Sequence, residues 1–529
     1  MRLPGSGYLG RILNMSRAME HLKEIMEALG PNKVFEDMPH RISHRMAHSP
    51  EILLHEDRWN SFLPDLVVTP ESTEDVVSIV KIANRYKIPL IPQGGRTGSL
   101  GSQGRKGAIA VSFHRMDKIL DFDEKNQLIT VEPGVRTGHL GEFLNKKGYV
   151  QVEYPAARSA CIGGRVGADG YNRYQFVTGR SKESVARIEV VFPDGEVAVL
   201  GDQGRRTTKS AFGYNLKDLI FGSRGTLCFV TKITLKCYKL PPIETWGYRA
   251  FPSPEDMVRA LIDVCQDPIA MFWTWRLTGT PYWILRKISK VFAGTEYPSD
   301  IGALLDYNVF GDSITVENTK KRLNEIFDKH NGFISDDLPS EEIVGRSAYT
   351  DRDIALCRFV SLTHDRFING GRGGMWISID PGIPNNNAVS YISKARQIQE
   401  ELGQMYPSLS KCCEFFPGIT VNVDPHCVFF SGLLVLDMPV FDKNIRDDFI
   451  KLYIDHAELV HSLGGSASYV HGFCPREKEI DIIKEEVGDV EYEIMKKIKK
   501  AIDPNNIMNP YVRFINEEDP VLQAILEGK

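Results

Sequence analysis

A glycine-rich segment early in the chain has the composition of a loop that binds phosphate. It reads Gln93-Gly94-Gly95-Arg96-Thr97-Gly98-Ser99 and directly follows the apolar residues Ile91 and Pro92. Glycines let backbone N–H groups point at an anion without a Cβ in the way, and the arginine and threonine add a charge and a hydroxyl group. The segment therefore predicts a phosphate-binding loop and, with it, a nucleotide cofactor.

A second glycine cluster follows further along the chain and reads Ser159-Ala160-Cys161-Ile162-Gly163-Gly164-Arg165-Val166-Gly167-Ala168. Two separated glycine-rich loops in one mixed α+β unit suit a long ligand that is held at two places, such as a dinucleotide. A nicotinamide-binding domain needs G-x-G-x-x-G between a strand and a helix, with an acidic residue about 20 positions later. Neither loop has that spacing, so the pattern disfavours a nicotinamide cofactor.

The apolar pattern shows which elements must position these loops. Val76, Ile79 and Val80 recur at helical spacing after a Ser72–Thr73 cap, which predicts a helix before the first loop. A strand over 87–92 then leads into the loop. Further strands are expected over 108–112, 128–132 and 188–191, and a helix over 137–147 that ends at Gly148.

Length and composition limit the class of protein. At 529 residues the chain is too long for one small core, and its net charge of −5 gives no general attraction to nucleic acid. Nine cysteines include no C-x-x-C pair, which predicts reduced thiols in a cytoplasmic protein and no iron–sulfur cluster of its own. No run of about 18 apolar residues is present. The aromatic segment 271–287 is expected to pack in the core as a strand and loop rather than at a membrane interface.

Eight motifs, taken together and in order, resemble a known family. They are PDLVVTPESTEDV, IPLIPQGGRTG, VSFHRMDKIL, ITVEPGV, CIGGRVGADG, VARIEVVFPDGEV, KSAFGYNLKDLIFGSRGTLCFVTKITLK and IDPNNIMNP. The family is the flavin-linked oxidases with the vanillyl-alcohol oxidase and p-cresol methylhydroxylase (PCMH) fold. Within it the chain is most similar to the flavin subunits of D-lactate and glycolate dehydrogenases, over about 65–240 and 455–513.

The resemblance implies an α+β fold. A PCMH-type FAD-binding domain of two subdomains would span 46–242, after an N-terminal extension and helix over 1–45. An α+β cap domain with an antiparallel sheet would span 243–455, and C-terminal helices over 456–529 would return to the FAD domain.

The resemblance also assigns the residues that hold FAD. The first loop would hold the pyrophosphate, the second would line the flavin and ribityl chain, and the strand at Val190 would present backbone groups to the adenine. Noncovalent attachment is expected, because covalent relatives have a histidine in the first loop, where this chain has Thr97 and Gly98. The full set is Pro92, Gln93, Gly94, Gly95, Arg96, Thr97, Gly98, Ser99, Pro155, Cys161, Gly163, Gly164, Gly167, Ala168, Val190 and Asn509.

Four residues depart from the motifs of the family. Cys161 replaces a threonine, Arg165 an asparagine, Thr178 a tyrosine and Arg224 a glutamate. FAD binding is still expected, because backbone N–H groups carry much of the contact with phosphate. Arg165 is expected either to favour an anionic group on the flavin or substrate or to point into solvent.

The chain lacks the metal ligands of the D-lactate and D-2-hydroxyglutarate branch. That branch uses two histidines of a His-x-Gly-Asp-Gly-Asn-x-x-His segment and a glutamate just before a later His-Gly pair. The matching segment, 418–430, has only His426, which we expect to be structural, and Val470 replaces the glutamate. The joint absence predicts that no catalytic metal is bound.

Two side chains are assigned to catalysis. The resemblance makes His471 the base that takes the substrate's hydroxyl proton while hydride moves to flavin N5, a task that an imidazole with a pKa near 6.5 suits. Arg346 would bind a substrate carboxylate, with Arg358 and Arg372 as alternatives.

These assignments predict an FAD-dependent oxidoreductase that oxidises the hydroxyl carbon of a small substrate, a 2-hydroxy acid such as D-lactate or glycolate. One alternative is a vanillyl-type phenolic alcohol oxidase with an aromatic pocket; another is a flavin-binding subunit without turnover. The expected acceptor is external: oxygen, a quinone or a redox partner protein. A homo-oligomer and peripheral membrane contact stay open. The residues named for the aromatic pocket are Trp273, Trp275, Tyr282 and Trp376.

Overall fold

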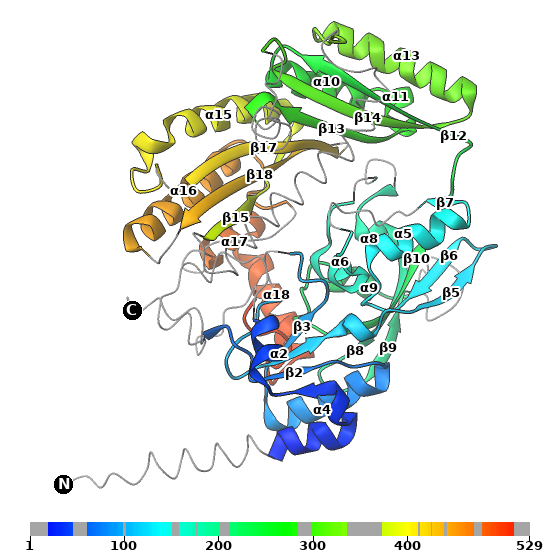
Figure 1. Cartoon of the computed structure of the whole chain (residues 1–529), viewed down its shortest axis with the longest axis vertical. Coiled ribbons are helices and arrows are strands. Elements are labelled where there is room, and N and C mark those ends of the chain that lie inside the picture. The colour runs from blue at the N-terminus through cyan, green and yellow to red at the C-terminus, as the bar shows by residue number, and fades with distance from the viewer. Residues whose placement is uncertain are drawn as a thin grey trace.

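The computed structural model describes residues 20–45, 61–98, 102–150, 158–172, 174, 178–201, 212–283, 299–335, 373–410, 413–424, 426–438, 442–469 and 479–512. Their strands form three larger β-sheets and one two-stranded sheet. In Figure 1 the largest sheet and its helices lie above the two smaller ones. The lower part is built mainly from the first half of the chain.

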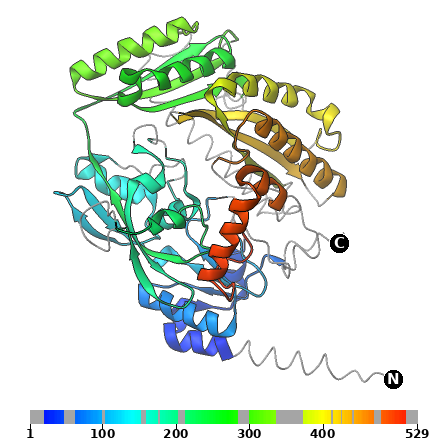
Figure 2. The ribbon, with the colours of Figure 1, turned by 180° about the vertical axis from the view of Figure 1, so that it is seen from behind.

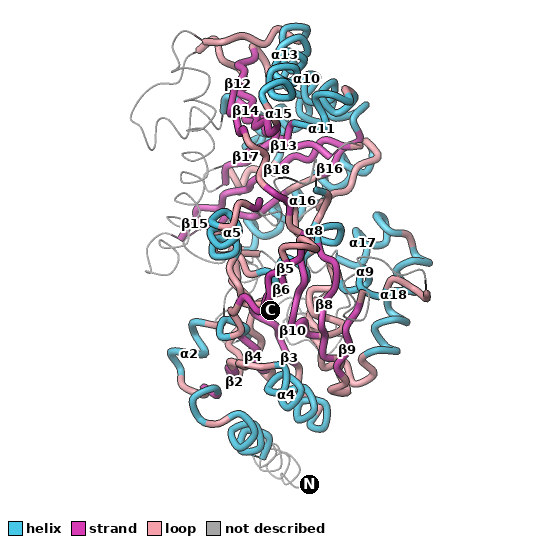
Figure 3. Tube along the Cα trace, turned by 90° about the vertical axis from the view of Figure 1, so that its right-hand side faces the viewer, coloured by secondary structure: helices cyan, strands magenta, loops and turns pink. Residues whose placement is uncertain are grey.

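The first sheet has the strand order β1-β2-β4-β3. Strand β1 pairs antiparallel with β2, whereas β2 and β3 both run parallel to β4. Helix α4 connects β2 to β3 and lies at the end of the molecule away from the largest sheet (Figure 3). The elements of this unit are η1 (Pro31–Lys33), β1 (Val34–Phe35), α2 (Met38–Ser43), β2 (Leu66–Val68), α4 (Thr73–Tyr86), β3 (Leu90–Gln93), β4 (Ile109–Ser112) and η3 (Phe113–Arg115).

Helix α4 forms where the sequence predicts it. The hydroxyl of Ser72 accepts the N–H of Asp75 at 3.2 Å, which caps the helix, and Val76 and Ile79 are fully buried. Lys87 takes a left-handed conformation with φ 56° and ends the helix. The following strand therefore begins at Leu90 instead of at 87.

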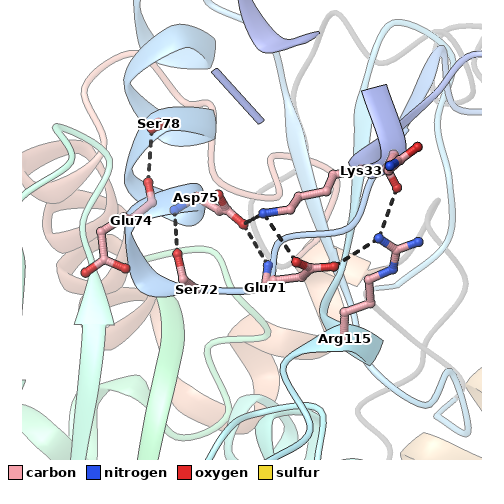
Figure 4. A network of polar contacts seen from close by, with 8 residues as sticks. Lys33, Glu71, Ser72, Glu74, Asp75, Ser78 and Arg115 are labelled. Atoms are coloured by element: carbon pink, nitrogen blue, oxygen red, sulfur yellow. Dashed lines mark hydrogen bonds and ion pairs between the residues drawn. The ribbon is translucent and has the colours of Figure 1, made fainter. Parts of the chain in front are cut away.

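A network of charges fastens the N-terminal segment to the start of α4 (Figure 4). The ammonium of Lys33 contacts the carboxylates of Asp75 at 2.7 Å and Glu71 at 3.4 Å. Arg115 reaches Glu71 at 3.1 Å and also donates to the carbonyl of Asn32. Because its groups are partly exposed, this network contributes more to the placement of β1 than to overall stability.

The second sheet is antiparallel, in the order β5-β6-β10-β8-β9, and a small β7–β11 pair lies apart from it. It carries the second glycine loop and the predicted strand over 188–191. The elements of this unit are β5 (Ile119–Asp123), β6 (Leu128–Val131), α5 (Thr137–Lys146), β7 (Tyr149–Val150), α6 (Ile162–Ala168), α8 (Ser181–Ser184), β8 (Val185–Val191), β9 (Val197–Leu200), α9 (Leu216–Ile220), β10 (Phe229–Lys236) and β11 (Tyr238–Lys239).

The largest sheet has seven antiparallel strands, in the order β12-β14-β13-β17-β18-β15 with β16 paired to β18. Helices α10, α13 and α15 cover the side away from the smaller sheets (Figure 1). The elements are β12 (Ile243–Phe251), α10 (Pro254–Gln266), α11 (Pro268–Trp273), β13 (Thr274–Pro281), β14 (Ala303–Gly311), α13 (Ser313–Lys329), β15 (Gly373–Ile379), β16 (Gly382–Pro384), η5 (Asn385–Asn387), α15 (Ala388–Met405), β17 (Cys413–Asp424), β18 (Cys427–Met438) and α16 (Lys443–Ser462).

Helix α16 continues through residue 455, where the sequence places the end of the cap, and packs against the seven-stranded sheet. Helices α17 (Glu479–Val487) and α18 (Asp489–Ile502) follow. Figure 2 shows α18, in red, beside the two smaller sheets. Its residues Ile498 and Ile502 pack on the core of the five-stranded sheet.

The described part of the aromatic segment, residues 271–283, is only partly buried, which corrects the prediction that this part packs wholly in the core. Trp275 and Trp283 are buried, but Phe272 is 63% exposed and Trp273 42% exposed, because they lie at the end of α11. No helix in the described ranges is both long and apolar enough to span a bilayer.

Candidate functional site

The first glycine loop leaves β3 at Gln93, which is fully buried. The side-chain Nε2 atom of Gln93 donates to the carbonyl oxygens of His44 and Ser102, both at 2.8 Å. Gln93 therefore holds α2's end and the returning end of the loop against β3. Its Oε1 atom is buried and accepts no hydrogen bond from a described residue.

The two glycine loops touch each other, although they come from different sheets. A Cβ on Gly95 would lie 2.4 Å from the carbonyl oxygen of Ser159, and a Cβ on Gly94 would lie 3.3 Å from Cβ of Cys161. Such a distance to backbone leaves no room for any side chain at 95. The two loops are therefore adjacent, as the predicted binding of one ligand by both of them requires.

Several backbone N–H groups around this contact are unused. Among the described residues none accepts a hydrogen bond from the N–H of Gly94, Arg96, Thr97, Gly98 or Gly164. Arg96 has φ 54°, so the loop combines left- and right-handed residues in the way that makes an anion-binding concavity. These residues are half-buried or, at Gly164, exposed, so a phosphate can reach their N–H groups and accept from them.

Within the second loop the glycines have different roles. Gly163 is packed: its N–H donates to the carbonyl of Pro133 at 2.8 Å, and a Cβ would meet Cβ of Pro133 at 2.6 Å. Gly164 is exposed, and a Cβ there would meet no atom within 4 Å. Open space beside Gly94, bordered by unused N–H groups, fits a cofactor that approaches the backbone.

A third turn completes the cradle. Arg224 has φ 54°, and its N–H donates to the carbonyl of Gly167 at 2.8 Å. Gly225 presses against Pro92, where a Cβ would lie 2.5 Å from Cγ. The backbone of this turn therefore contacts both glycine loops, whichever side chain stands at 224.

Asn509 and Val190 occupy supporting positions. Asn509 is buried; its N–H donates to the carbonyl of Leu90 at 2.9 Å and its Nδ2 to the carbonyl of Arg224 at 2.7 Å. Val190 is fully buried in β8, paired with Val230 and Ala198, so it can offer a ligand only backbone atoms.

The ionisable groups at the first loop are shifted by burial. Burial lowers the pKa of His44 to about 4, and the nearby Arg96 adds to this, so the imidazole is neutral at pH 7. Arg96 donates to the carbonyl of Ser43, which directs its side chain toward α2. Burial raises the pKa of Cys161 to about 11, so this residue packs as a neutral thiol beside Gly94.

The side chain of Arg165 takes neither of the two predicted orientations, toward an anionic group or toward solvent. Its side chain is buried, and Nη2 donates to the carbonyl oxygens of Gly170, at 2.9 Å, and Tyr171. It holds the chain that leaves α6 instead of facing solvent or an anion. Thr178, in place of the family's tyrosine, donates to the carbonyl of Tyr174 at 2.9 Å and has the same local role.

Aromatic rings join this unit to the seven-stranded sheet. The ring centroid of Tyr171 lies 5.2 Å from that of Phe429 in β18, and the ring centroid of Phe429 lies 5.3 Å from that of Tyr469. The hydroxyl of Tyr469 donates to Asp424 of β17 at 3.2 Å, and its N–H donates to the carbonyl of Asp380 at 2.8 Å. The segment after the second glycine loop is thus in direct contact with the sheet above it.

The residues named for an aromatic pocket do not form one cluster. Trp275 packs with Phe310 and Tyr174, whereas Tyr282 packs on Trp283. The side chain of Trp376 lies outside the described part. His426 is exposed in the turn between β17 and β18.

The residues assigned to catalysis, His471 and Arg346, lie outside the described residues, as do Ser99 and Pro155. Their roles remain predictions from the sequence. Within the described ranges, no three His, Cys, Asp or Glu side chains come together as ligands for a metal ion.

Comparison with known families agrees with this geometry. Residues 64–201 match the FAD binding domain family, and residues 311–512 match the family described as FAD linked oxidases, C-terminal domain. The first match contains both glycine loops. The chain belongs to the FAD-linked oxidases and dehydrogenases. It is an FAD-dependent oxidoreductase of the D-lactate dehydrogenase and glycolate oxidase type.

Individual relatives cover nearly the whole flavoprotein. A probable mitochondrial D-lactate dehydrogenase of Danio rerio is 29% identical over 84% of each chain, and a glycolate oxidase subunit of Bacillus subtilis is 22% identical over 86% of this chain and 90% of its own. Substrate-bound p-cresol methylhydroxylase has the same fold, with a TM-score of 0.74 and 18% identity over 95% of this chain and 97% of its own. The predicted α+β, PCMH-type fold is therefore confirmed.

Several residues that shape the flavoprotein's site were not found from the sequence. His44 and Ser102 hold Gln93, and Tyr469 ties the cap strands to the region above the second loop. Only Tyr469 carried a local signal, because it stands two positions before His471. The other contacts join segments far apart in the chain.

Gly164→Ala should leave the apoprotein as stable as the wild type or more so, because alanine is favoured over glycine in a helix by about 1 kcal/mol and meets no neighbour. It should weaken FAD binding by about tenfold or more, since the Cβ enters the space assigned to the cofactor. Gly95→Ala should instead lower the apoprotein Tm. Thermal unfolding and FAD titration check both; unchanged FAD affinity in Gly164→Ala would place the cofactor elsewhere.

Acid should destabilise the fold between pH 6.5 and 4. His44, whose pKa is lowered to about 4 in the fold, regains a pKa of about 6.5 on unfolding, so its contribution is present above pH 6.5 and lost as pH falls through this window. Buried His456, with its pKa also lowered to about 4, acts in the same direction. Urea unfolding at pH 7 and at pH 5 should show a smaller loss of the free energy of unfolding for His44→Gln than for the wild type. Equal losses in the two proteins would show that the pKa of His44 is not lowered in the fold.

Proposed function

We propose that this flavoprotein oxidises the hydroxyl-bearing carbon of a small 2-hydroxy acid, such as D-lactate or glycolate, without a catalytic metal. The observation that carries the proposal is the Tyr171–Phe429–Tyr469 contact. It connects Tyr469, through Phe429, to the chain that leaves the second glycine loop. His471 follows Tyr469 by two positions in the sequence.

In this proposal each residue of the site has its own task. Bound FAD supplies the acceptor for hydride from the substrate carbon. The first loop and the N–H of Gly164 hold the pyrophosphate, and His471 takes the proton of the substrate hydroxyl. Arg346 pairs with the substrate carboxylate. The relatives named D-lactate dehydrogenase, D-2-hydroxyglutarate dehydrogenase and glycolate oxidase support an acid substrate.

The absence of a metal is proposed from the ligand positions. Asp424 already accepts the hydroxyl of Tyr469, and exposed His426 has no second histidine beside it in the segment 418–430. Val470 replaces the glutamate of the metal-dependent branch. Proton removal must therefore depend on His471 and nearby donors.

A phenolic alcohol oxidase is the second candidate, because the wall formed by Tyr171, Phe429 and Tyr469 is aromatic. Anaerobic mixing of the FAD-loaded protein with D-lactate, glycolate and 4-alkylphenols separates the candidates. Bleaching of the flavin by a 2-hydroxy acid alone supports the proposal. Bleaching by phenols alone replaces it, and no bleaching by either class indicates a subunit without turnover.

His471→Ala should slow reduction of the flavin by about 10²–10⁴-fold, the usual contribution of a general base, while FAD content stays unchanged. FAD content should be unchanged because the residues assigned to hold FAD are mainly those of the glycine loops, and His471 is not among them. Stopped-flow reduction by the best 2-hydroxy acid measures the rate. A rate within about threefold of the wild type, well below that range, would make His471 structural.

Chelation should leave the rate of flavin reduction unchanged, because the described ranges contain no group of metal-ligating side chains. The test is prolonged dialysis against EDTA, followed by elemental analysis and the same anaerobic assay. Loss of activity that returns with stoichiometric zinc or manganese would contradict the metal-free proposal.

A further inference from the structure

A buried ion pair lies where the C-terminal end of the described chain meets the cofactor loops. Lys499 of α18 and Asp503 have side chains that are 7% and 0% exposed, and Nζ lies 2.5 Å from Oδ2. The same ammonium donates to the carbonyl oxygens of Thr226, at 2.8 Å, and Met508, at 2.7 Å. All three donors of the ammonium are therefore used.

Asp503 shapes the turn that follows α18. Its Oδ1 accepts the N–H of Ile507 at 3.1 Å and its Oδ2 accepts the N–H of Met508 at 2.7 Å. This places residues 507–509 beside β3: the N–H of Leu90 donates to the carbonyl of Ile507 at 2.7 Å. The turn thus adds a short parallel segment to the free edge of β3.

These residues, which we call the C-terminal latch (499–512), contact the site at two points. One is β3, which leads directly into the first glycine loop. The other is the third turn, where Lys499 bonds Thr226 and Asn509 bonds the carbonyl of Arg224. Arg224 in turn donates its N–H to Gly167 of the second loop.

We propose that Lys499 and Asp503 are positioning residues of the FAD site, and that docking of the C-terminal latch and binding of FAD strengthen each other. The latch holds β3 at its first residue, Leu90, and holds the turn at 224–226; β3 leads into the first loop, and the turn contacts Gly167 of the second. A ligand that needs this arrangement stabilises it, and the coupling is reciprocal because it is an equilibrium property. This proposal rests on FAD binding and is independent of the substrate.

The wild-type protein provides the first test. Full-length protein is stripped of FAD, and cleavage by chymotrypsin at Tyr511 is followed with and without saturating FAD. The latch is expected to be cut about tenfold more slowly in the presence of FAD, because opening is then opposed by bound ligand. Equal rates would overturn the coupling.

Lys499→Met and Asp503→Asn provide the second test, by titration of the apoproteins with FAD. Lys499→Met should raise the Kd for FAD by about tenfold or more, and Asp503→Asn less, because the amide keeps one acceptor for the turn. The matched control is Lys484→Met, which removes a Lys–Asp pair at 3.0 Å whose lysine is 37% exposed on α17. It should bind FAD within about twofold of the wild type.

An Lys499→Met protein with the FAD affinity of Lys484→Met would overturn the positioning role. If Lys499→Met does not fold, Asn509→Gly keeps the left-handed backbone of Asn509, with φ 41°, and removes the side-chain bond to the carbonyl of Arg224. Its FAD affinity should then fall, and an unchanged value would also overturn the proposal. Neither result depends on which substrate the enzyme oxidises.

Discussion

The cofactor site depends on one backbone contact, the approach of Gly95 to the carbonyl of Ser159. The two loops come from different sheets, so this contact requires the two sheets to be held accurately in position relative to each other. Polar bonds between them provide that placement: Thr73 of α4 donates to Glu189 of β8 at 2.7 Å, and Asn84 donates to the carbonyl of Pro193 at 2.5 Å. Binding of a dinucleotide is therefore a property of the two sheets together.

Sequence patterns predicted what is decided locally. The cap at Ser72, the helix that it starts and the two glycine loops follow from residue type and spacing over a few positions. Arg165 was misjudged because its course depends on carbonyl oxygens at 170 and 171, which only the folded turn brings back toward it. The hydrogen bond from Lys499 to Thr226 joins residues 273 positions apart in the sequence, so no local sequence pattern predicts it.

Two of the four substitutions that separate this chain from its family, at Cys161 and Arg224, are compatible with the fold for a common reason. At Arg224 and Cys161 the contacts that build the site come mainly from the backbone. Arg224 uses its N–H and its carbonyl, and the carbonyl of Cys161 accepts the N–H of Arg165. A change of side chain then alters charge and packing but not the turn. Positions where the side chain itself holds the loop, such as Gln93, have no comparable freedom.

The FAD-binding unit is joined to the rest of the chain in two physically different ways. Above the second loop the contact is aromatic, through Tyr171, Phe429 and Tyr469, and tolerates small changes in shape while excluding water. Below, at Lys499 and Asp503, it is a buried ion pair that is costly to break on one side only. We therefore expect changes at the aromatic contact to alter the choice of substrate with little effect on FAD binding, because the ion pair and its turn contact Thr226 and Leu90, which are not part of the strands above them.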